Sequence, residues 1–278
     1  MYVRGGSLIG SDVHDTSVRF AHVVWLSHTE ADTHIPANFQ ECVLSWEHCT
    51  GVQLVVWLNS DCLELLRLYS DNVSFYKTKL KSPVERSDYM RMIILHEFGG
   101  FYSDVDVWVQ NDFVNHIDVS RPVALVRSPL VTEAFQSCLL VANTRHHPLW
   151  LDIVRRIENN VRSVECGSCG RIVYWLLRVP MLGRLVRTML TVFITGPPNI
   201  DRCLALKCRI YCNDVQVLDE RFYSGPIAFH QEAGSWTPFF RAGIVVAALI
   251  DRVKRVTSMG TQRVGKVQSI FFQRCSVS

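Results

Sequence analysis

The sequence lacks any long hydrophobic run, which limits its relation to membranes. No stretch approaches the ~18 consecutive apolar residues typical of a membrane-spanning helix. Residues 1–17 contain Gly, Ser, Asp and His and lack the apolar core of a secretory signal peptide. We therefore expect neither a spanning segment nor a secretion signal in this chain, and a cytoplasmic or peripheral-membrane location.

The sequence also lacks a strong excess of charge of either sign. Its net charge at pH 7 is only +3, and its basic residues are not interleaved with aromatic residues along a stripe. Nucleic-acid-binding proteins usually concentrate positive charge in this way. We therefore exclude nucleic acid as a main partner. With 278 residues, 48% of them hydrophobic, the chain can bury one substantial core, so we expect a single globular domain.

The ten cysteines are too few for a disulfide scaffold and many for a cytosolic protein. Four of them have apolar neighbours and are interpreted as small core residues: Cys42, Cys49, Cys62 and Cys138. Cys166 and Cys169 form a C-x-x-C pair that could contribute to a zinc site. The later cysteines at 203, 208 and 212 have poor spacing for zinc, so we favour disulfides or free thiols.

The segment from Ser82 to Val109 contains the most informative local signals. Ser82, Pro83 and Glu85 form a capping box with proline at the first helical position, and Gly99 follows the last apolar residue of the pattern. These signals predict a helix from Pro83 to Phe98.

Asp88 and Arg91 share one face of this helix with apolar residues. A charged pair on an apolar stripe has two interpretations: a salt bridge that locks the helix to the sheet, or a binding site for a polar ligand.

Residues 101–109 alternate between apolar and polar side chains, which predicts a strand. Asp104 and Asp106 lie on the same side of that strand, and neighbouring carboxylates repel each other unless a cation or a donor lies between them. Oxygen ligands suit Mg²⁺ or Mn²⁺. The pattern therefore indicates a metal site, with a solvated strand end as the alternative.

The chain before this segment predicts a β–α–β unit. Residues 18–26 and 52–58 are apolar strands separated by a helix at 39–49. Such alternation predicts a mostly parallel sheet flanked by helices, with ligands at the carboxyl ends of the strands, where Trp25 and the aspartates fall. Four further elements are predicted from the same patterns: a helix at 63–69 with a polar connection after it, strands at 122–127 and 137–142, and a helix at 147–160.

Two motifs stand close together in this segment: SDxxR at 87–91 and FGGFYxDxD at 98–106. This combination resembles the DxD glycosyltransferases of family 32 in the sequence-based classification, which include mannosyltransferases and α-1,4-hexosyltransferases. The resemblance implies a Rossmann-like GT-A fold, a nucleotide-sugar donor, Mn²⁺ or Mg²⁺, and retention of anomeric configuration. It implies that Asp88 and Arg91 hold hydroxyls of the donor sugar, that Asp104 contacts ribose and sugar, and that Asp106 binds the metal.

Further residues carry the resemblance outside this segment. Trp25 occupies a position under the donor's base, although a core aromatic is an equal interpretation, and His22 is interpreted as a core histidine. His230 precedes Gly-Ser-Trp and is expected to join Asp104 and Asp106 as a metal ligand. The remaining expected donor-binding residues are Gly99, Gly100, Tyr102, Ser235 and Trp236. The family places a hydrophobic residue at Ser103 and an asparagine near Ser137, and this sequence departs from both.

The two ends and one interior segment complete the organisation. We expect a flexible lead at 1–17, a GT-A domain at 18–250 and a basic tail at 251–278. Residues 175–194 are apolar with spaced arginines; a core-packed helix is the simpler interpretation, and contact with a membrane surface, shared by the tail, is the other.

We therefore predict a retaining, metal-dependent hexosyltransferase that acts on a glycan or glycolipid acceptor. GDP-mannose is the first choice of donor and a UDP-hexose the second. The alternative is a carbohydrate- or nucleotide-sugar-binding module that has lost turnover. Such a module would be expected to lose one of the four charged residues, and Asp88, Arg91, Asp104 and Asp106 are all present. A metal-dependent phosphohydrolase is a third interpretation, but a site for two metals would need more carboxylates or histidines than this pattern supplies.

Overall fold

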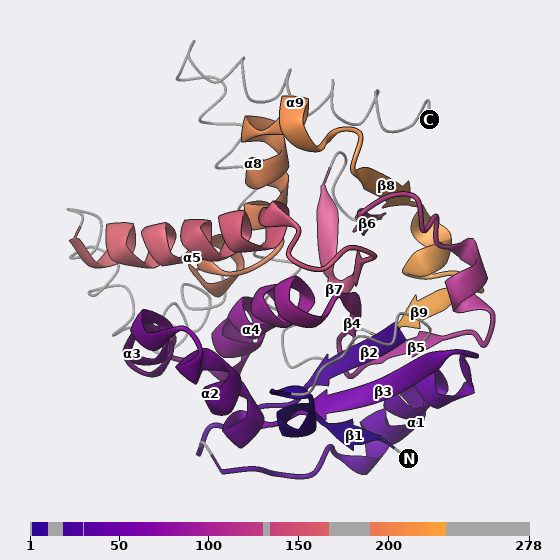
Figure 1. The fold of residues 1–278 in the computed structure, drawn as a ribbon, viewed down its shortest axis with the longest axis horizontal. Helices are drawn as coiled ribbons and strands as arrows, with labels where there is room; N and C mark the ends of the chain where they lie inside the picture. The colour runs from indigo at the N-terminus through magenta and orange to yellow at the C-terminus, as the bar shows by residue number, and fades with distance from the viewer. Residues whose placement is uncertain (1, 11–18, 30, 130–133, 167–189, 232–278) are drawn as a thin grey trace, which may run out of the picture.

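A seven-stranded mixed sheet forms the centre of the protein in this computed structural model, which describes residues 2–10, 19–29, 31–129, 134–166 and 190–231 (Figure 1). Four of its strand pairs are parallel, and β7 is antiparallel to both neighbours. The predicted α/β fold with a mostly parallel sheet is thus confirmed. In spatial order the strands are β1 (Val3–Arg4), β3 (Val52–Trp57), β2 (Arg19–Val24), β4 (Gly100–Ser103), β7 (Phe135–Ala142), β6 (Val123–Arg127) and β8 (Val215–Leu218).

Helices cover both faces of the sheet, because its strands carry apolar side chains on both sides. Along β3, Val55 and Trp57 belong to one hydrophobic cluster, and Leu54 and Val56 belong to a second. The first cluster lies under α4 (Pro83–Phe98) and α5 (Pro148–Cys166), and the second under α1 (Ala37–Ser45). The other helices are α2 (Asn59–Arg67), α3 (Ser70–Lys79), α8 (Pro198–Leu206) and α9 (Cys208–Tyr211), with short 3₁₀ turns at Gly5–Leu8, Trp46–His48, Phe113–His116 and Glu220–Phe222.

The predicted helix Pro83–Phe98 is confirmed with its bounds. The Ser82 hydroxyl accepts the Glu85 N–H at 3.2 Å, and the Glu85 carboxylate accepts the Ser82 N–H at 3.2 Å. Gly99 then turns the chain with a φ of 65°. These local contacts fix where α4 begins and ends, and hence where Asp88 and Arg91 lie.

The predicted continuous strand at 101–109 is wrong. The chain leaves β4 after Ser103, turns at Asp104–Asp106, and continues as β5 (Val107–Val109) in a separate two-stranded sheet with β9 (Ala228–His230). The Val107 N–H donates to the Asp104 carbonyl at 3.2 Å and closes the turn. The two aspartates therefore lie at a corner between two sheets.

Two connections are more ordered than expected. Residues 2–10 of the predicted flexible lead form β1 and a 3₁₀ turn, held by the Arg4 guanidinium on Asp61 at 2.9 Å. The predicted polar connection before Ser82 contains α3, whose Tyr76 is buried. Val73, Tyr76 and Leu80 have helical spacing, which is the signal that could have predicted α3. Residues 11–17 and the basic tail lie outside the described residues.

His22 is the core histidine that was predicted. Its Nε2–H donates to the Gly99 carbonyl at 3.1 Å, and its Nδ1 accepts the Trp57 indole N–H at 3.1 Å. Complete burial lowers the pKa of His22 to about 3, so the ring is neutral. It joins β2, β3 and the start of β4.

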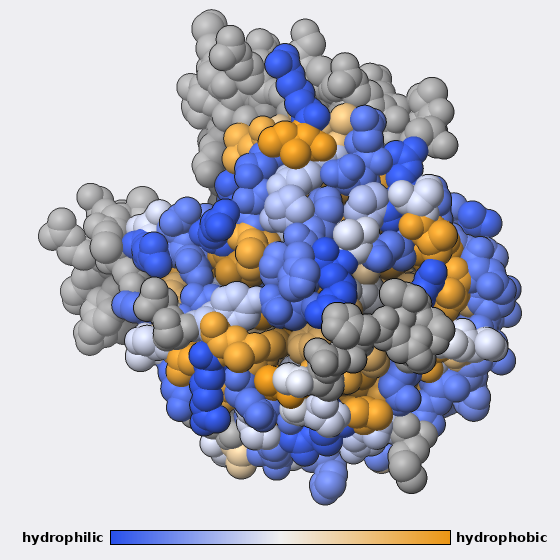
Figure 2. Space-filling model, viewed as in Figure 1, coloured by the Kyte–Doolittle hydropathy of each residue, from blue (hydrophilic) through white to orange (hydrophobic). Residues whose placement is uncertain are grey.

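The surface is mixed. Figure 2 shows hydrophilic residues over most of one face, with apolar colour gathered in places such as the region of α8 and α9. There Leu206 and Ile210 are 70% and 61% exposed. Among the described residues, no helix has both the length and the apolar character needed to cross a membrane.

Gly100 is expected to tolerate no side chain. Its φ is 82°, and a Cβ there would lie 2.3 Å from the Phe20 carbonyl oxygen in the neighbouring strand. We expect Gly100→Ala to lower the free energy of unfolding by about 3 kcal/mol, measured by urea denaturation. Gly51 is the matched control, because its φ is 75° and a Cβ there would meet no atom within 4 Å. Gly51→Ala should cost only about 1 kcal/mol, and equal losses would contradict the steric argument.

Asp201 is expected to make stability depend on pH. Its carboxylate accepts the Phe135 N–H at 2.9 Å, and burial raises its pKa from 3.8 to about 7. Because the folded state then binds the proton more tightly than the unfolded chain does, this contribution to stability is present below about pH 4 and lost as the pH rises through about 7.

Asp201→Asn keeps the acceptor oxygen and cannot ionise. We expect this variant to unfold with a free energy about 2 kcal/mol higher than the wild type at about pH 8, allowing for partial solvent screening, and with an equal value near pH 4. Urea denaturation at both pH values measures the difference. A difference that does not change with pH would contradict the assignment.

Candidate active site

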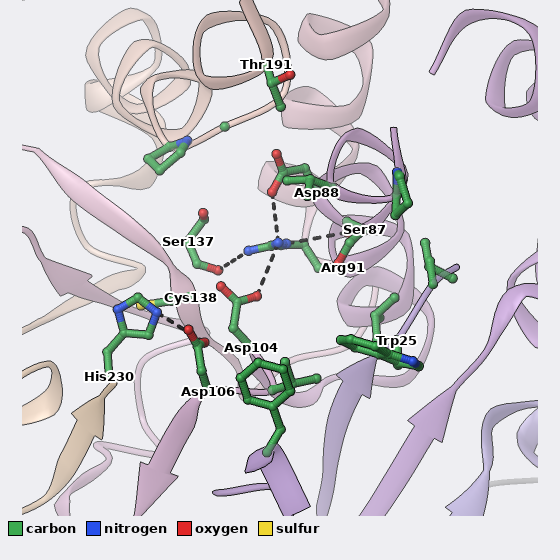
Figure 3. Close-up of a pocket in the computed structure, with 18 of the residues that line it drawn as sticks. Trp25, Ser87, Asp88, Arg91, Asp104, Asp106, Ser137, Cys138, Thr191 and His230 are labelled. Carbon is green, nitrogen blue, oxygen red and sulfur yellow. Dashed lines mark hydrogen bonds and ion pairs between the residues drawn. The ribbon is translucent and has the colours of Figure 1, made fainter. Parts of the chain in front are cut away.

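A cavity of about 720 Å³ opens at the carboxyl ends of β2 and β4 (Figure 3). Its walls come from the segment after β2, from the first turns of α4, from the Asp104–Asp106 corner, from β7 and from the segment 191–197. Ligands of open α/β sheets bind at this edge. The predicted site residues that line it are Trp25, Asp88, Arg91, Asp104, Asp106 and His230.

Arg91 is the centre of the charged network in this cavity. Its guanidinium lies 2.8 Å from Asp88 Oδ1 and 3.3 Å from Asp104 Oδ1, and it donates to the Ser137 carbonyl at 2.5 Å. The group is buried, and its carbon lies 4.5 Å from the centre of the Tyr102 ring. The predicted Asp88–Arg91 salt bridge is therefore present, and the same residues also face the cavity. The salt bridge is thus confirmed, and the role of the pair in binding a polar ligand stays a prediction.

Asp88 is held from two sides. Arg91 binds one carboxylate oxygen, and the Thr195 hydroxyl donates to the other at 2.7 Å. Burial raises the pKa of Asp88 to about 6, although Arg91 and Thr195 both oppose this rise. The sequence analysis did not predict the Thr195 contact, because the two residues are 107 positions apart.

Tyr102 takes a different place from the one expected. It is completely buried and does not line the cavity, so a direct donor contact is not seen. Its hydroxyl donates to Asp104 Oδ1 at 2.6 Å. Burial raises the pKa of Asp104, while Arg91 lowers it. Tyr102 thus orients the Asp104 carboxylate from below.

Gly99 and Gly100 also lie away from the cavity. Gly99 caps α4 and Gly100 begins β4, whereas the carboxylates follow the other end of that strand. Both have positive φ, at 65° and 82°, and pack closely on neighbouring backbone. These two glycines therefore allow the chain to leave α4 and to begin β4 beside β2.

Asp106 and His230 meet because β5 pairs with β9. Val107 lies opposite His230 in that pair, which brings His230 Nε2 within 3.2 Å of Asp106 Oδ1. One ligand atom each from Asp104, Asp106 and His230 lies within 4.8 Å of the others. Two carboxylates and an imidazole at this separation fit a divalent cation. The expected partners Ser235 and Trp236 lie outside the described residues.

Trp25 forms a wall of the cavity rather than part of the core. It is partly exposed, its indole N–H donates to the Thr33 hydroxyl at 3.1 Å, and its ring lies 6.0 Å from Phe39. Several residues that line the cavity were not predicted to be site residues. Among them are Phe39, Ser137 and Tyr223, whose place in the cavity wall only the folded chain shows.

One match to a known protein family bears on the class of enzyme. Residues 31–123 match the family described as "Glycosyltransferase sugar-binding region containing DXD motif". This region contains Asp88, Arg91, Asp104 and Asp106, and the match supports the predicted enzyme class, a glycosyltransferase. It does not distinguish family 32 from other members of that class. No curated protein matches the chain.

Two solved glycosyltransferases are distantly similar in structure. The "PaToxG Glycosyltransferase" is 12% identical with a TM-score of 0.42, and the match covers 69% of this chain and 70% of that one. GlyE of Streptococcus pneumoniae TIGR4 is 10% identical with a TM-score of 0.34, and the match covers 74% of this chain and 46% of GlyE. The aligned part thus spans about half the length of GlyE.

Proposed function

We propose that this protein transfers a hexose from a nucleotide sugar to a glycan or glycolipid acceptor, with the donor bound in the cavity beside Arg91. The observation that carries the proposal is the meeting of five charged or metal-binding side chains in one cavity, from three parts of the chain: α4, the turn after β4, and β9. These are Asp88, Arg91, Asp104, Asp106 and His230. A cavity of about 720 Å³ is within the usual range for such ligands.

The donor sugar is proposed to lie against Asp88, Arg91 and Asp104. Carboxylates and a guanidinium recognise hydroxyl groups through charge-assisted hydrogen bonds, which are stronger than neutral ones. The Arg91 network fixes both carboxylates before a ligand arrives, so little ordering is needed on binding. The base is proposed to pack on Trp25, whose position at the cavity wall supports an aromatic contact.

Asp104, Asp106 and His230 are proposed to hold Mn²⁺ or Mg²⁺. When bound, the cation supplies positive charge against the diphosphate leaving group. Asp106 and His230 would fix the diphosphate end of the donor, and Asp104 would join this end to the sugar subsite. Ser235 and Trp236 are proposed to cover the diphosphate and exclude water.

Transfer is proposed to retain the anomeric configuration through same-face attack by the acceptor. GDP-mannose is the first choice of donor and a UDP-hexose the second. Both choices rest on the family resemblance, and the cavity supports a nucleotide sugar in general. Arg91 and the Ser137 carbonyl that it binds would keep the sugar in one orientation during the reaction.

Slow hydrolysis of the donor tests this proposal without an identified acceptor. We expect the full chain with Mn²⁺ to release nucleoside diphosphate from one of GDP-mannose, UDP-glucose or UDP-galactose. Proton NMR of the first sugar formed should show the α anomer, because these donors are α-linked and retention is proposed. A β anomer would contradict retention. Binding of a donor with no hydrolysis would favour a binding module that has lost turnover.

A further inference from the structure

A second cluster of metal-binding side chains lies at the far end of α4, away from the cavity. His96 and Glu97 are at the end of this helix, and His146 lies in the turn between β7 and α5. One ligand atom from each lies within 4.8 Å of the other two. His96 is eight residues beyond Asp88, or about 12 Å along the helix axis. This cluster is therefore separate from the proposed donor site.

Each side chain of the cluster is already oriented by a partner. His96 Nδ1 donates to the His147 carbonyl at 3.4 Å, so its Nε2 carries the lone pair. That nitrogen lies 3.8 Å from Glu97 Oε1, and the Tyr69 hydroxyl donates to the same oxygen. Histidine and carboxylate ligands of metals are commonly oriented by such outer hydrogen bonds. A nitrogen lone pair that faces a carboxylate leaves a place for a cation between them.

The third residue is placed by its backbone. His146 has a φ of 57°, and its N–H donates to the His96 carbonyl at 2.7 Å. This contact brings its exposed ring to 5.0 Å from the His96 ring, at an angle of 73°. The structure thus places the His146 ring beside that of His96, although the two residues are far apart in the sequence.

We propose that His96, Glu97 and His146 bind a first-row transition-metal dication, with Zn²⁺ as the best fit. Two imidazoles, one carboxylate and an open fourth position are a known zinc arrangement. Tetrahedral Zn²⁺ separates nitrogen ligands by about 3.3 Å, so a contraction of at most about 1.5 Å from the present separations closes the site. Mg²⁺ and Ca²⁺ prefer oxygen ligands and would bind weakly here. Arg145 lies nearby, and its guanidinium donates to the Glu97 carbonyl at 2.7 Å. Its positive charge further disfavours any cation that would be held by charge alone.

The metal would join the end of α4 to the turn before α5. Among the described residues, this cluster and the Asp104 cluster are the two groups that bring three such ligands together. The proposed zinc would stabilise the helix that carries Asp88 and Arg91 without touching the donor. Because the site is separate from the donor cavity, the inferred role of the metal is to stabilise this connection.

Cobalt binding followed by visible absorption tests the site. The full chain carries Asp106→Asn, which removes the other cluster from the measurement, and a reducing agent keeps the thiols reduced. We expect one equivalent of Co²⁺ with the absorption of four-coordinate nitrogen and oxygen ligation, and a higher thermal midpoint with Zn²⁺. Adding His146→Gly should weaken Co²⁺ binding at least ~10-fold and abolish the thermal shift. This second substitution relieves the positive φ, so the metal-free fold should be kept.

His48→Ala in the same Asp106→Asn chain is the matched control, because His48 is exposed and lies outside the cluster. It should bind Co²⁺ as tightly as the Asp106→Asn chain does. Three results would each overturn the proposal. The first is no Co²⁺ binding, and the second is equal Co²⁺ affinity in the His146→Gly chain. The third is thiolate-to-cobalt absorption that His146→Gly leaves unchanged.

Discussion

Asp106→Asn is expected to abolish donor hydrolysis while the protein stays folded. The amide has nearly the same shape as the carboxylate but loses the negative charge that the proposed cation needs. Loss of charge stabilisation at a leaving group commonly lowers kcat by ~10³-fold or more. Release of nucleoside diphosphate, with thermal unfolding as the check on folding, measures this effect.

The matched control for this substitution is Asp112→Asn. Asp112 has the same side chain, is 51% exposed and lies outside the cavity, where it contacts His116 at 3.3 Å. Its substitution should leave hydrolysis within about twofold of the wild type, since surface pairs contribute little. An Asp106→Asn enzyme with wild-type activity would remove the metal from the proposed mechanism.

Arg91→Met is expected to cause the largest loss of stability. Methionine has a similar length but no charge, so the buried Asp88 carboxylate, the partly buried Asp104 carboxylate and the Ser137 carbonyl lose their shared partner. Removing one member of a buried ionic network typically costs about 3–5 kcal/mol, because the remaining charges stay buried and unpaired. Urea denaturation gives the free energy of unfolding of both proteins.

Arg162→Met controls for the loss of a guanidinium in general. Arg162 is 66% exposed and lies 3.8 Å from Glu158 on α5. Its substitution should change the free energy of unfolding by less than about 1 kcal/mol. If the Arg91 and Arg162 variants lost equal stability, Arg91 would not be the centre of a buried network.

The sequence predicts those parts of the fold that depend on neighbouring residues. The bounds of α4 follow from a capping box and a glycine, whose partners lie within a few positions. The strands β2 and β3 follow from apolar runs. Arg91 and Asp88 share a helix face for the same local reason. These predictions succeed because the physical cause is contained in the segment itself.

The other parts of the site depend on contacts between distant segments. The alternation at 101–109 does not mark the point where the chain changes sheets, because β4 is buried on both faces and β5 buries Val107 and Val109. What breaks the strand is the pairing of β5 with β9, more than 100 positions away. Thr195 on Asp88 and the Ser137 carbonyl on Arg91 are long-range contacts of the same kind. No local pattern could have predicted them.

The predicted roles of Tyr102 and the two glycines show a related limit. Their positions in the motif suggested donor contacts, while the structure buries Tyr102 under Arg91 and places the glycines at the other end of β4. A motif marks residues that a site needs. Burial then decides whether such a residue contacts the ligand itself or supports another residue that contacts it.

The most direct test of the proposed donor site is thermal unfolding with GDP and with UDP, each in the presence and absence of Mn²⁺. A ligand at 100 times its Kd adds about 2.7 kcal/mol to stability, which raises the unfolding midpoint by roughly 5 °C or more for a chain of this size. We expect such a shift with one nucleotide, only with Mn²⁺, in the wild type and in Asp112→Asn, and its loss in Asp106→Asn. No shift with either nucleotide would contradict the donor site and would favour a module that binds glycans alone.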